Sequence, residues 1–196
     1  MIEDMRIPIP VCNENFTLPG GGSIREFAEA LGGKLSEAAV DVIFQKLGLN
    51  KIFTDGTCTV APSPTDCPWN IDVEKYLPAN VKDKVTCGMP DNCFGLHCCV
   101  DFEFKIPFVD EPIQKSVPVF LEFDPCNFVL KVGFGQFQHT ETLLTYDWGK
   151  PSTLTIGNGD PAPITISFTI AQYPKGFIVD LNVKACIPID GTPFCF

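Results

Sequence analysis

The stretch VDFEFKIPF at residues 100–108 decides the fold class of this chain. Val100 and Phe102, like the apolar residues after them, alternate with charged residues, which is the two-residue period of a strand with one buried face. The same period returns in further short segments separated by turn sequences, such as GNGD at residues 157–160. About seven strands of this kind predict a mainly β (α+β) fold, built as an antiparallel β-sandwich or a curled sheet.

Six further strands are expected after the first, and their prolines and glycines limit how these strands can pair. They lie at residues 117–123, 128–134, 143–148, 154–156, 164–170 and 177–185. Pro107 and Pro118 cannot donate to a ladder, so their strands are expected at sheet edges or bulges. Gly133 and Gly135 within a strand predict a bulge or a close approach of backbone.

An amphipathic helical segment is expected before the strands, over residues 23–48. Ser23 and Glu26 have the spacing of a capping box. Apolar residues then recur at helical spacing on both sides of Gly32-Gly33, which is expected to break or bend the helix. The simplest interpretation of residues 23–48 is a pair of helices that covers one face of the sheet.

The remaining organisation follows from proline, glycine and cysteine. Residues 1–22 read as an extended Pro/Gly-rich arm, and residues 23–196 as a single disulfide-stapled domain. Within that domain we expect helices over 23–48, Cys-rich loops over 49–99, strands over 100–186 and a Cys-tied tail over 187–196.

Ten cysteines are the second decisive feature of the chain. This density indicates an oxidising compartment, and an even count suggests that all ten are paired. We expect disulfides at Cys12, Cys58, Cys67, Cys87, Cys93, Cys98, Cys99, Cys126, Cys186 and Cys195. The vicinal pair Cys98-Cys99 is expected to bond two different partners and so to pin the first strand to the loop region. A metal cluster with His97 is the weaker alternative, because paired C-x2-C spacings are absent.

Charge and hydropathy favour a secreted protein. The net charge of −10 disfavours binding to nucleic acid or to an anionic membrane. No stretch approaches the roughly 20 apolar residues of a membrane span. Asn15-Phe16-Thr17 is an acceptor sequence for N-glycosylation at Asn15. The start at Met1 lacks the pattern of a signal peptide, so a mature form or a piece of a longer secreted protein is expected.

Residues that could carry chemistry are few. His139 lies near Glu141 and Asp147 in the sequence, but no Gly-x-Ser-x-Gly nucleophile motif occurs. We therefore predict no catalytic residues and no resident cofactor. Calcium is a minor possibility, because turn residues of the expected loops supply suitable oxygen atoms without an EF-hand spacing. These residues are Asp124, Asn127, Asn158 and Asp160.

The leading functional hypothesis is a secreted, non-catalytic structural or interaction module. Its partners would be copies of itself or neighbouring modules, contacted through apolar sheet surface, a sheet edge or the arm at residues 1–22. The alternative is an extracellular carrier of a small apolar, lipid-like ligand, held by strand phenylalanines under a helix at residues 34–48. A hydrolase that uses His139 is a third, weaker hypothesis.

Overall fold

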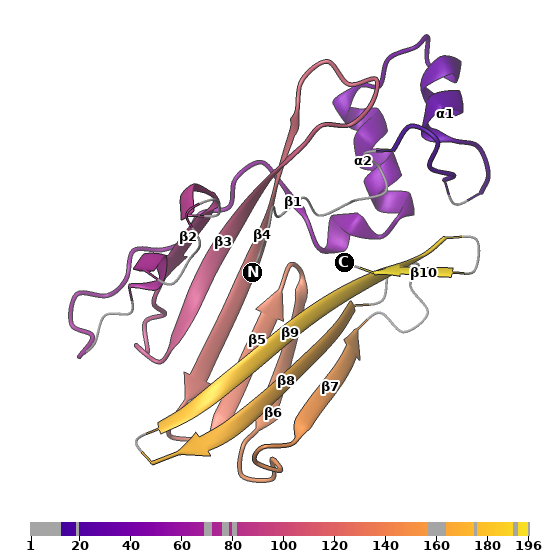
Figure 1. The fold of residues 1–196 in the computed structure, drawn as a ribbon. Coiled ribbons are helices and arrows are strands. Elements are labelled where there is room, and N and C mark those ends of the chain that lie inside the picture. The colour runs from indigo at the N-terminus through magenta and orange to yellow at the C-terminus, as the bar shows by residue number, and fades with distance from the viewer. Residues whose placement is uncertain are drawn as a thin grey trace. The chain divides into compact units, whose positions relative to one another are not determined.

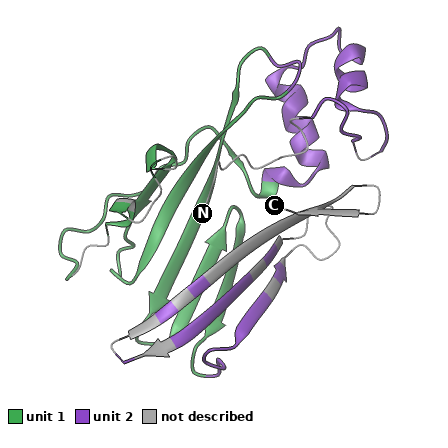
Figure 2. Cartoon of the chain, viewed as in Figure 1, with its two compact units in different colours: residues 1–7, 51–106, 110–144 green, residues 8–50, 107–109, 145–196 purple. Residues whose placement is uncertain are grey.

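The computed structural model describes residues 13–18, 20–68, 72–75, 79, 82–156, 164–174, 176–189 and 192–195. The chain divides into two compact units (Figure 2). Unit 1 comprises residues 1–7, 51–106 and 110–144, and unit 2 comprises residues 8–50, 107–109 and 145–196. Cys12, most of the expected arm and the expected turn at residues 157–160 lie outside the described residues.

Unit 1 is built on a six-stranded antiparallel sheet (Figure 1). Its strands follow the order β2 (Val85–Gly88), β3 (Gly95–Phe104), β4 (Ile113–Asp124), β5 (Val129–Phe134) and β6 (Phe137–Thr142), and the short β1 (Thr54–Asp55) pairs with β4. The alternating stretch that begins at Val100 lies in β3, as predicted, although the strand ends at Phe104, before Pro107. The mainly β, antiparallel fold class is therefore confirmed.

The two faces of this sheet differ in character. Residues that oppose one another across the strands share a face, and the face alternates along each strand. One face, here called the polar face, carries His97, Cys99, Asp101, Gln114, Ser116, Phe120, Glu122, Lys131, Gln138 and Thr140. The other, the apolar face, carries Leu96, Cys98, Val100, Phe102, Val117, Val119, Leu121 and Val132. The most deeply buried side chains of unit 1 include Leu130, Val132 and Ile52.

Unit 2 combines two helices with a second antiparallel sheet. The helices are α1 (Ile24–Ala30) and α2 (Glu37–Lys46), and the sheet has the order β10 (Thr192–Cys195), β9 (Gly176–Ile189), β8 (Ile164–Tyr173) and β7 (Pro151–Ile156). The described residues also form three short 3₁₀ helices, η2 (Leu49–Lys51), η3 (Val73–Lys75) and η4 (Lys82–Lys84). Phe44, Leu47, Phe168 and Ile170 are among the buried side chains of this unit.

The helix boundaries follow the predicted signals. The Ser23 hydroxyl accepts the Glu26 N–H at 3.1 Å, and the Glu26 carboxylate accepts the Ser23 N–H at 3.0 Å, so the capping box is present. Gly32, directly after the C-cap Leu31, ends α1 with a φ of 89°, and the N–H of Gly33 donates to the carbonyl of Ala28 at 2.8 Å. Such a left-handed residue is the usual helix terminator. The predicted break at the glycine pair is confirmed.

The strand predicted at residues 143–148 is wrong, because this segment is a turn and loop. Leu143 and Tyr146 are buried here without a strand, whereas Leu144 and Trp148 are exposed. Tyr146 stacks on Phe168 with ring centroids 5.9 Å apart. The Tyr146 hydroxyl donates to the carbonyl of Lys150 at 2.5 Å and accepts the N–H of Ile170 at 3.0 Å. The contacts of Tyr146 thus hold a loop whose apolar residues follow the sequence pattern of a strand.

The expected edge position of Pro118 is also wrong, since β4 lies between β3 and β5. The proline occupies a gap in the ladder instead. On one side of β4, β1 pairs as far as Ser116 and β5 begins to pair at Val119. The carbonyl of Pro118 accepts the Gly135 N–H at 2.8 Å on the β5 side. The N and O atoms of a strand residue point to the same side, so the missing donor costs no ladder bond.

Candidate functional site

Three disulfides fasten the irregular segment of unit 1 to itself and to β3. Cys58 bonds Cys99, Cys67 bonds Cys93 and Cys87 bonds Cys98, with Cα–Cα distances of 5.7, 5.4 and 4.1 Å. The vicinal cysteines therefore bond two different partners, as predicted. Cys126 has an exposed free thiol, which contradicts the disulfide predicted at this residue. The remaining disulfides stay predictions, because Cys12 and the side chains of Cys186 and Cys195 are not described.

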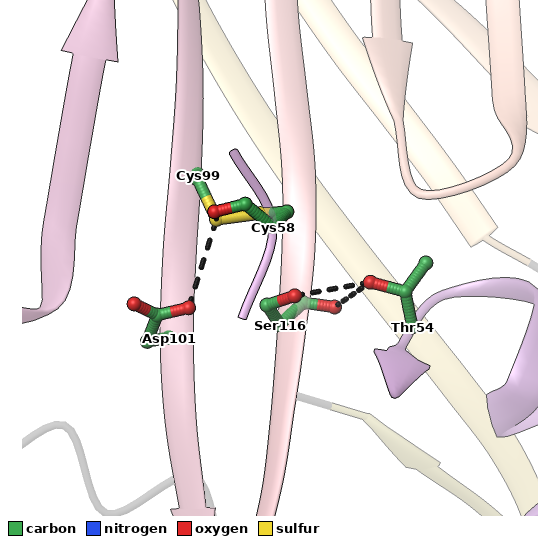
Figure 3. Close-up of a disulfide and its surroundings, with 5 residues drawn as sticks. All are labelled: Thr54, Cys58, Cys99, Asp101 and Ser116. Carbon is green, nitrogen blue, oxygen red and sulfur yellow. Dashed lines mark hydrogen bonds between the residues drawn. A yellow bond between two sulfur atoms is a disulfide. The ribbon is translucent and has the colours of Figure 1, made fainter. Parts of the chain in front are cut away.

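The Cys58–Cys99 disulfide lies on the polar face beside several polar groups (Figure 3). Asp101 Oδ1 is 3.6 Å from Cys99 Sγ, and the Thr54 hydroxyl lies 3.0 Å from the hydroxyl of Ser116. Cys58, Cys99 and Asp101 bring three ligand-type atoms within 4.8 Å of one another. Thiolates bind metals, whereas both sulfurs here are bonded to each other. In the oxidised protein this cluster is therefore a disulfide crosslink.

The same staple holds the loop after Cys58 across β2. The side chain of Ser63 accepts the Met89 N–H at 2.9 Å. A Cβ atom on Gly88 would lie 2.6 Å from the carbonyl oxygen of Ala61, so only glycine allows this approach. The loop and the β2–β3 part of the polar face thus form one fixed surface.

A histidine–glutamate pair occupies the polar face farther along β3 and β4. His97 Nε2 lies 2.6 Å from Glu122 Oε1, and both side chains are partly exposed. The His97 ring also contacts Phe120, with centroids 5.6 Å apart. Phe120 in turn covers Gly133, where a Cβ atom would meet its ring at 1.8 Å. The close backbone approach predicted at the glycine pair occurs instead at Gly135, where a Cβ atom would lie 2.7 Å from the carbonyl oxygens of Lys51 and Ile52.

This pair can hold and transfer a proton, but hydrolysis by a covalent route also requires a nucleophile bonded to the base. Within the described part of the chain, neither a serine hydroxyl nor a free thiol bonds to His97. Ser116, on the same face, shares its hydroxyl hydrogen bond with Thr54. The His97–Glu122 pair therefore forms part of the polar surface that lies around Phe120.

The second histidine lies on the other face of the sheet. His139 Nε2 is 3.2 Å from Glu141 Oε2, so the structure brings together two of the three residues considered from the sequence. Asp147 instead forms an ion pair with Lys150 at 2.5 Å within unit 2. Because His97 and His139 project from opposite faces, they do not contribute to one site.

The turn between β4 and β5 uses the carboxylate of Asp124 internally. One oxygen accepts the N–H groups of Cys126 and Asn127 at 3.0 and 3.1 Å, and the other accepts the Asn127 side-chain amide at 2.7 Å. These bonds, the Asn127 side chain first, lower the pKa of Asp124 below its usual range. Asp124 and Asn127 were candidate calcium ligands, and here they stabilise a turn. The other two candidates, Asn158 and Asp160, lie outside the described residues.

Three phenylalanines and one leucine lie at the same end of the sheet, and we call this group the aromatic end: Phe94, Phe123, Phe128 and Leu144. The ring centroids of Phe94 and Phe123 are 6.4 Å apart, and those of Phe123 and Phe128 are 6.3 Å apart. Phe128 is 48% exposed and Leu144 is 73% exposed. The N–H of Leu143 donates to the carbonyl of Phe128 at 2.8 Å, so the residue directly before Leu144 is hydrogen-bonded to Phe128.

Sequence reasoning missed the aromatic end. Alternation placed Phe128 inside a strand with a buried face, but the residue lies in the turn with a φ of 53°. A non-glycine residue with positive φ is uncommon and costs conformational free energy. No sequence pattern marks such a residue as exposed. The only available signal was the turn sequence DPCN at residues 124–127, which ends directly before it.

No protein-family model, curated protein or solved structure matches the chain. The described helices include none that is long and apolar enough to cross a membrane. The three disulfides fit an extracellular protein, since such bonds persist in oxidising compartments. Any function must therefore be inferred from the surfaces and staples described above.

Proposed function

We propose that this protein is a secreted, non-catalytic interaction module that binds a second copy of itself through the aromatic end. The observation that carries the proposal is the exposure of two large apolar side chains, Phe128 and Leu144, at one end of the sheet. Large apolar side chains exposed at one end of a sheet can mark a protein–protein contact.

The covalent staples support a role in binding. The Cys67–Cys93 disulfide ends at the residue directly before Phe94, so it restrains the first member of the aromatic end. The Phe123 N–H then donates to the carbonyl of Phe94 at 2.7 Å, and Asn92 donates to the carbonyl of Phe123 at 3.2 Å. A restrained surface loses little conformational entropy on binding.

The chemistry of the aromatic end favours a second copy as the partner. Most soluble oligomers are symmetric homo-oligomers in which one patch serves both partners. Two copies that meet here would join apolar side chains. The carboxylate of Asp124 in the adjoining turn lies near Lys131, whose positive charge offsets part of the repulsion between like charges. The strong net negative charge also argues against nucleic acid or an anionic membrane.

Sedimentation velocity of the secreted, unreduced chain over a range of concentrations tests the proposal. We expect a reversible dimer or larger assembly whose dissociation constant rises at least tenfold in the double variant Phe128→Ser/Leu144→Ser. Each exposed side chain buried on association contributes up to about 1.5–3 kcal/mol, which sets this scale. The matched control is Leu31→Ser/Val42→Ser, which removes exposed apolar residues of unit 2.

A monomer at every concentration would overturn the proposal, as would an equal effect of the control variant. The lipid-carrier and hydrolase hypotheses remain predictions. An organic extract of the native protein without any lipid-like mass would count against the carrier. Unchanged hydrolytic activity in His139→Ala would count against the hydrolase.

A further inference from the structure

We infer that Cys186 and Cys195 form a fourth disulfide, which closes the hairpin of β9 and β10. The inference comes from the backbone register, and it is independent of the proposed function. In the antiparallel pairing of these strands, Cys195 is the direct partner of Cys186. Residues that oppose one another directly share a face of the sheet.

The prolines of this hairpin determine which kind of pair the cysteines occupy. Opposed residues in an antiparallel ladder alternate between hydrogen-bonded and non-hydrogen-bonded pairs. Pro188 is opposed to Pro193, and a proline has no N–H to exchange. That pair is therefore a non-hydrogen-bonded one. Cys186 and Cys195 lie two positions along each strand, so they form a non-hydrogen-bonded pair as well.

Non-hydrogen-bonded pairs are the positions where opposed Cα atoms come closest, at about 4.5 Å. This spacing falls at the short end of the range that disulfides span, about 4.4–6.8 Å. The same chain provides a direct precedent in unit 1. Cys87 and Cys98 are also direct partners on neighbouring antiparallel strands, and they form a disulfide with a Cα–Cα distance of 4.1 Å.

The chemistry requires an oxidant, which we take to be the disulfide of a thiol–disulfide oxidoreductase. One cysteine thiolate attacks that disulfide and forms a mixed disulfide, and the second cysteine thiolate then displaces the enzyme thiol. The two cysteines lose two protons and two electrons in total, and the oxidant is reduced to two thiols. The product ties the four-residue strand β10, at one edge of its sheet, to the longer β9.

Peptide mapping of the unreduced, secreted chain after alkylation of free thiols tests this inference. Trypsin cleaves after Lys184, so residues 185–196 with both cysteines form one peptide. We expect this peptide to escape alkylation, to weigh two hydrogen atoms less than its reduced form and to take up two alkyl groups after reduction. The variant Cys186→Ser should expose one alkylatable thiol at Cys195, whereas the control Cys126→Ser should leave the peptide unchanged.

Two results would overturn the inference. One is alkylation of Cys186 or Cys195 in the unreduced wild-type chain, and the other is a mixed peptide that links either residue to Cys12 or Cys126. Both results come from the wild-type protein, so a variant that fails to fold does not weaken the test.

Discussion

Replacing Gly133 with alanine tests the tightest packing contact of the polar face. An alanine Cβ at this position would lie 1.8, 2.3 and 2.4 Å from three carbon atoms of the Phe120 ring. Carbon atoms pack at about 3.5–4.0 Å, so the ring must move by roughly 2 Å or the strands must separate. Overpacking of this kind costs about 1–3 kcal/mol, and the severity of the overlap favours the upper half of that range.

The same substitution has the opposite sign once the ring is removed. Glycine within a strand is less favourable than alanine by roughly 0.5–1 kcal/mol. In a Phe120→Ala background, Gly133→Ala should therefore stabilise the protein by about that amount. The coupling between the two positions, obtained from a double-mutant cycle, is then about 3 kcal/mol.

Urea unfolding of the unreduced chain measures all four members of this cycle. We expect the midpoint to fall in Gly133→Ala, to fall in Phe120→Ala, and to rise when Gly133→Ala is added to Phe120→Ala. Effects that add within about 0.5 kcal/mol would refute the reasoning, because independent sites behave in that way. The ring of Phe120 would then not lie over Gly133.

Two further predictions concern the staples and the turn. The Cys58–Cys99 disulfide joins residues with a sequence separation of 41, and in isolation a loop of that length would stabilise the folded state by about 4 kcal/mol. The Cys67–Cys93 disulfide lies within this loop and shortens its effective length to about 15 residues. Cys58→Ala/Cys99→Ala should therefore lower the free energy of unfolding by about 3 kcal/mol in a urea titration, and a loss below about 1 kcal/mol would contradict the chain-entropy account. Because hydrogen bonds lower the folded pKa of Asp124, its contribution is present above the unfolded pKa and is lost as pH falls through the folded value, below about pH 4. The protection factor of the Asn127 amide, its exchange rate relative to that of an unstructured peptide at the same pH, should fall in that acid range, and Asp124→Ala should abolish this fall; equal protection factors in both proteins would contradict the assignment.

The sequence predicts those features that depend on local periodicity and capping. The alternation around Val100 and the capping box at Ser23 each require only neighbouring residues, and both predictions are confirmed. The segment around Tyr146 was misassigned because a run of apolar residues does not specify an extended backbone, and here only Leu143 and Tyr146 are buried. The aromatic end was missed because the exposure of Phe128 depends on a turn conformation that alternation does not encode. The position of Pro118 depends on where two other strands stop, which is a property of the assembled sheet.

The vicinal cysteines show how a local rule can predict a long-range arrangement in part. Successive residues of a strand point to opposite faces, so Cys98 and Cys99 cannot bond to partners on one side of the sheet. Cys98 bonds across the apolar face to its direct neighbour Cys87, and Cys99 bonds on the polar face to Cys58 in the covering loop. The number of partners follows from the strand period alone. Their identities do not, because the position of Cys58 beside Cys99 depends on the pairing of β1, three residues before it, with β4. Two adjacent cysteines therefore crosslink β3 on both of its faces, and removing either disulfide should leave the crosslink on the opposite face intact.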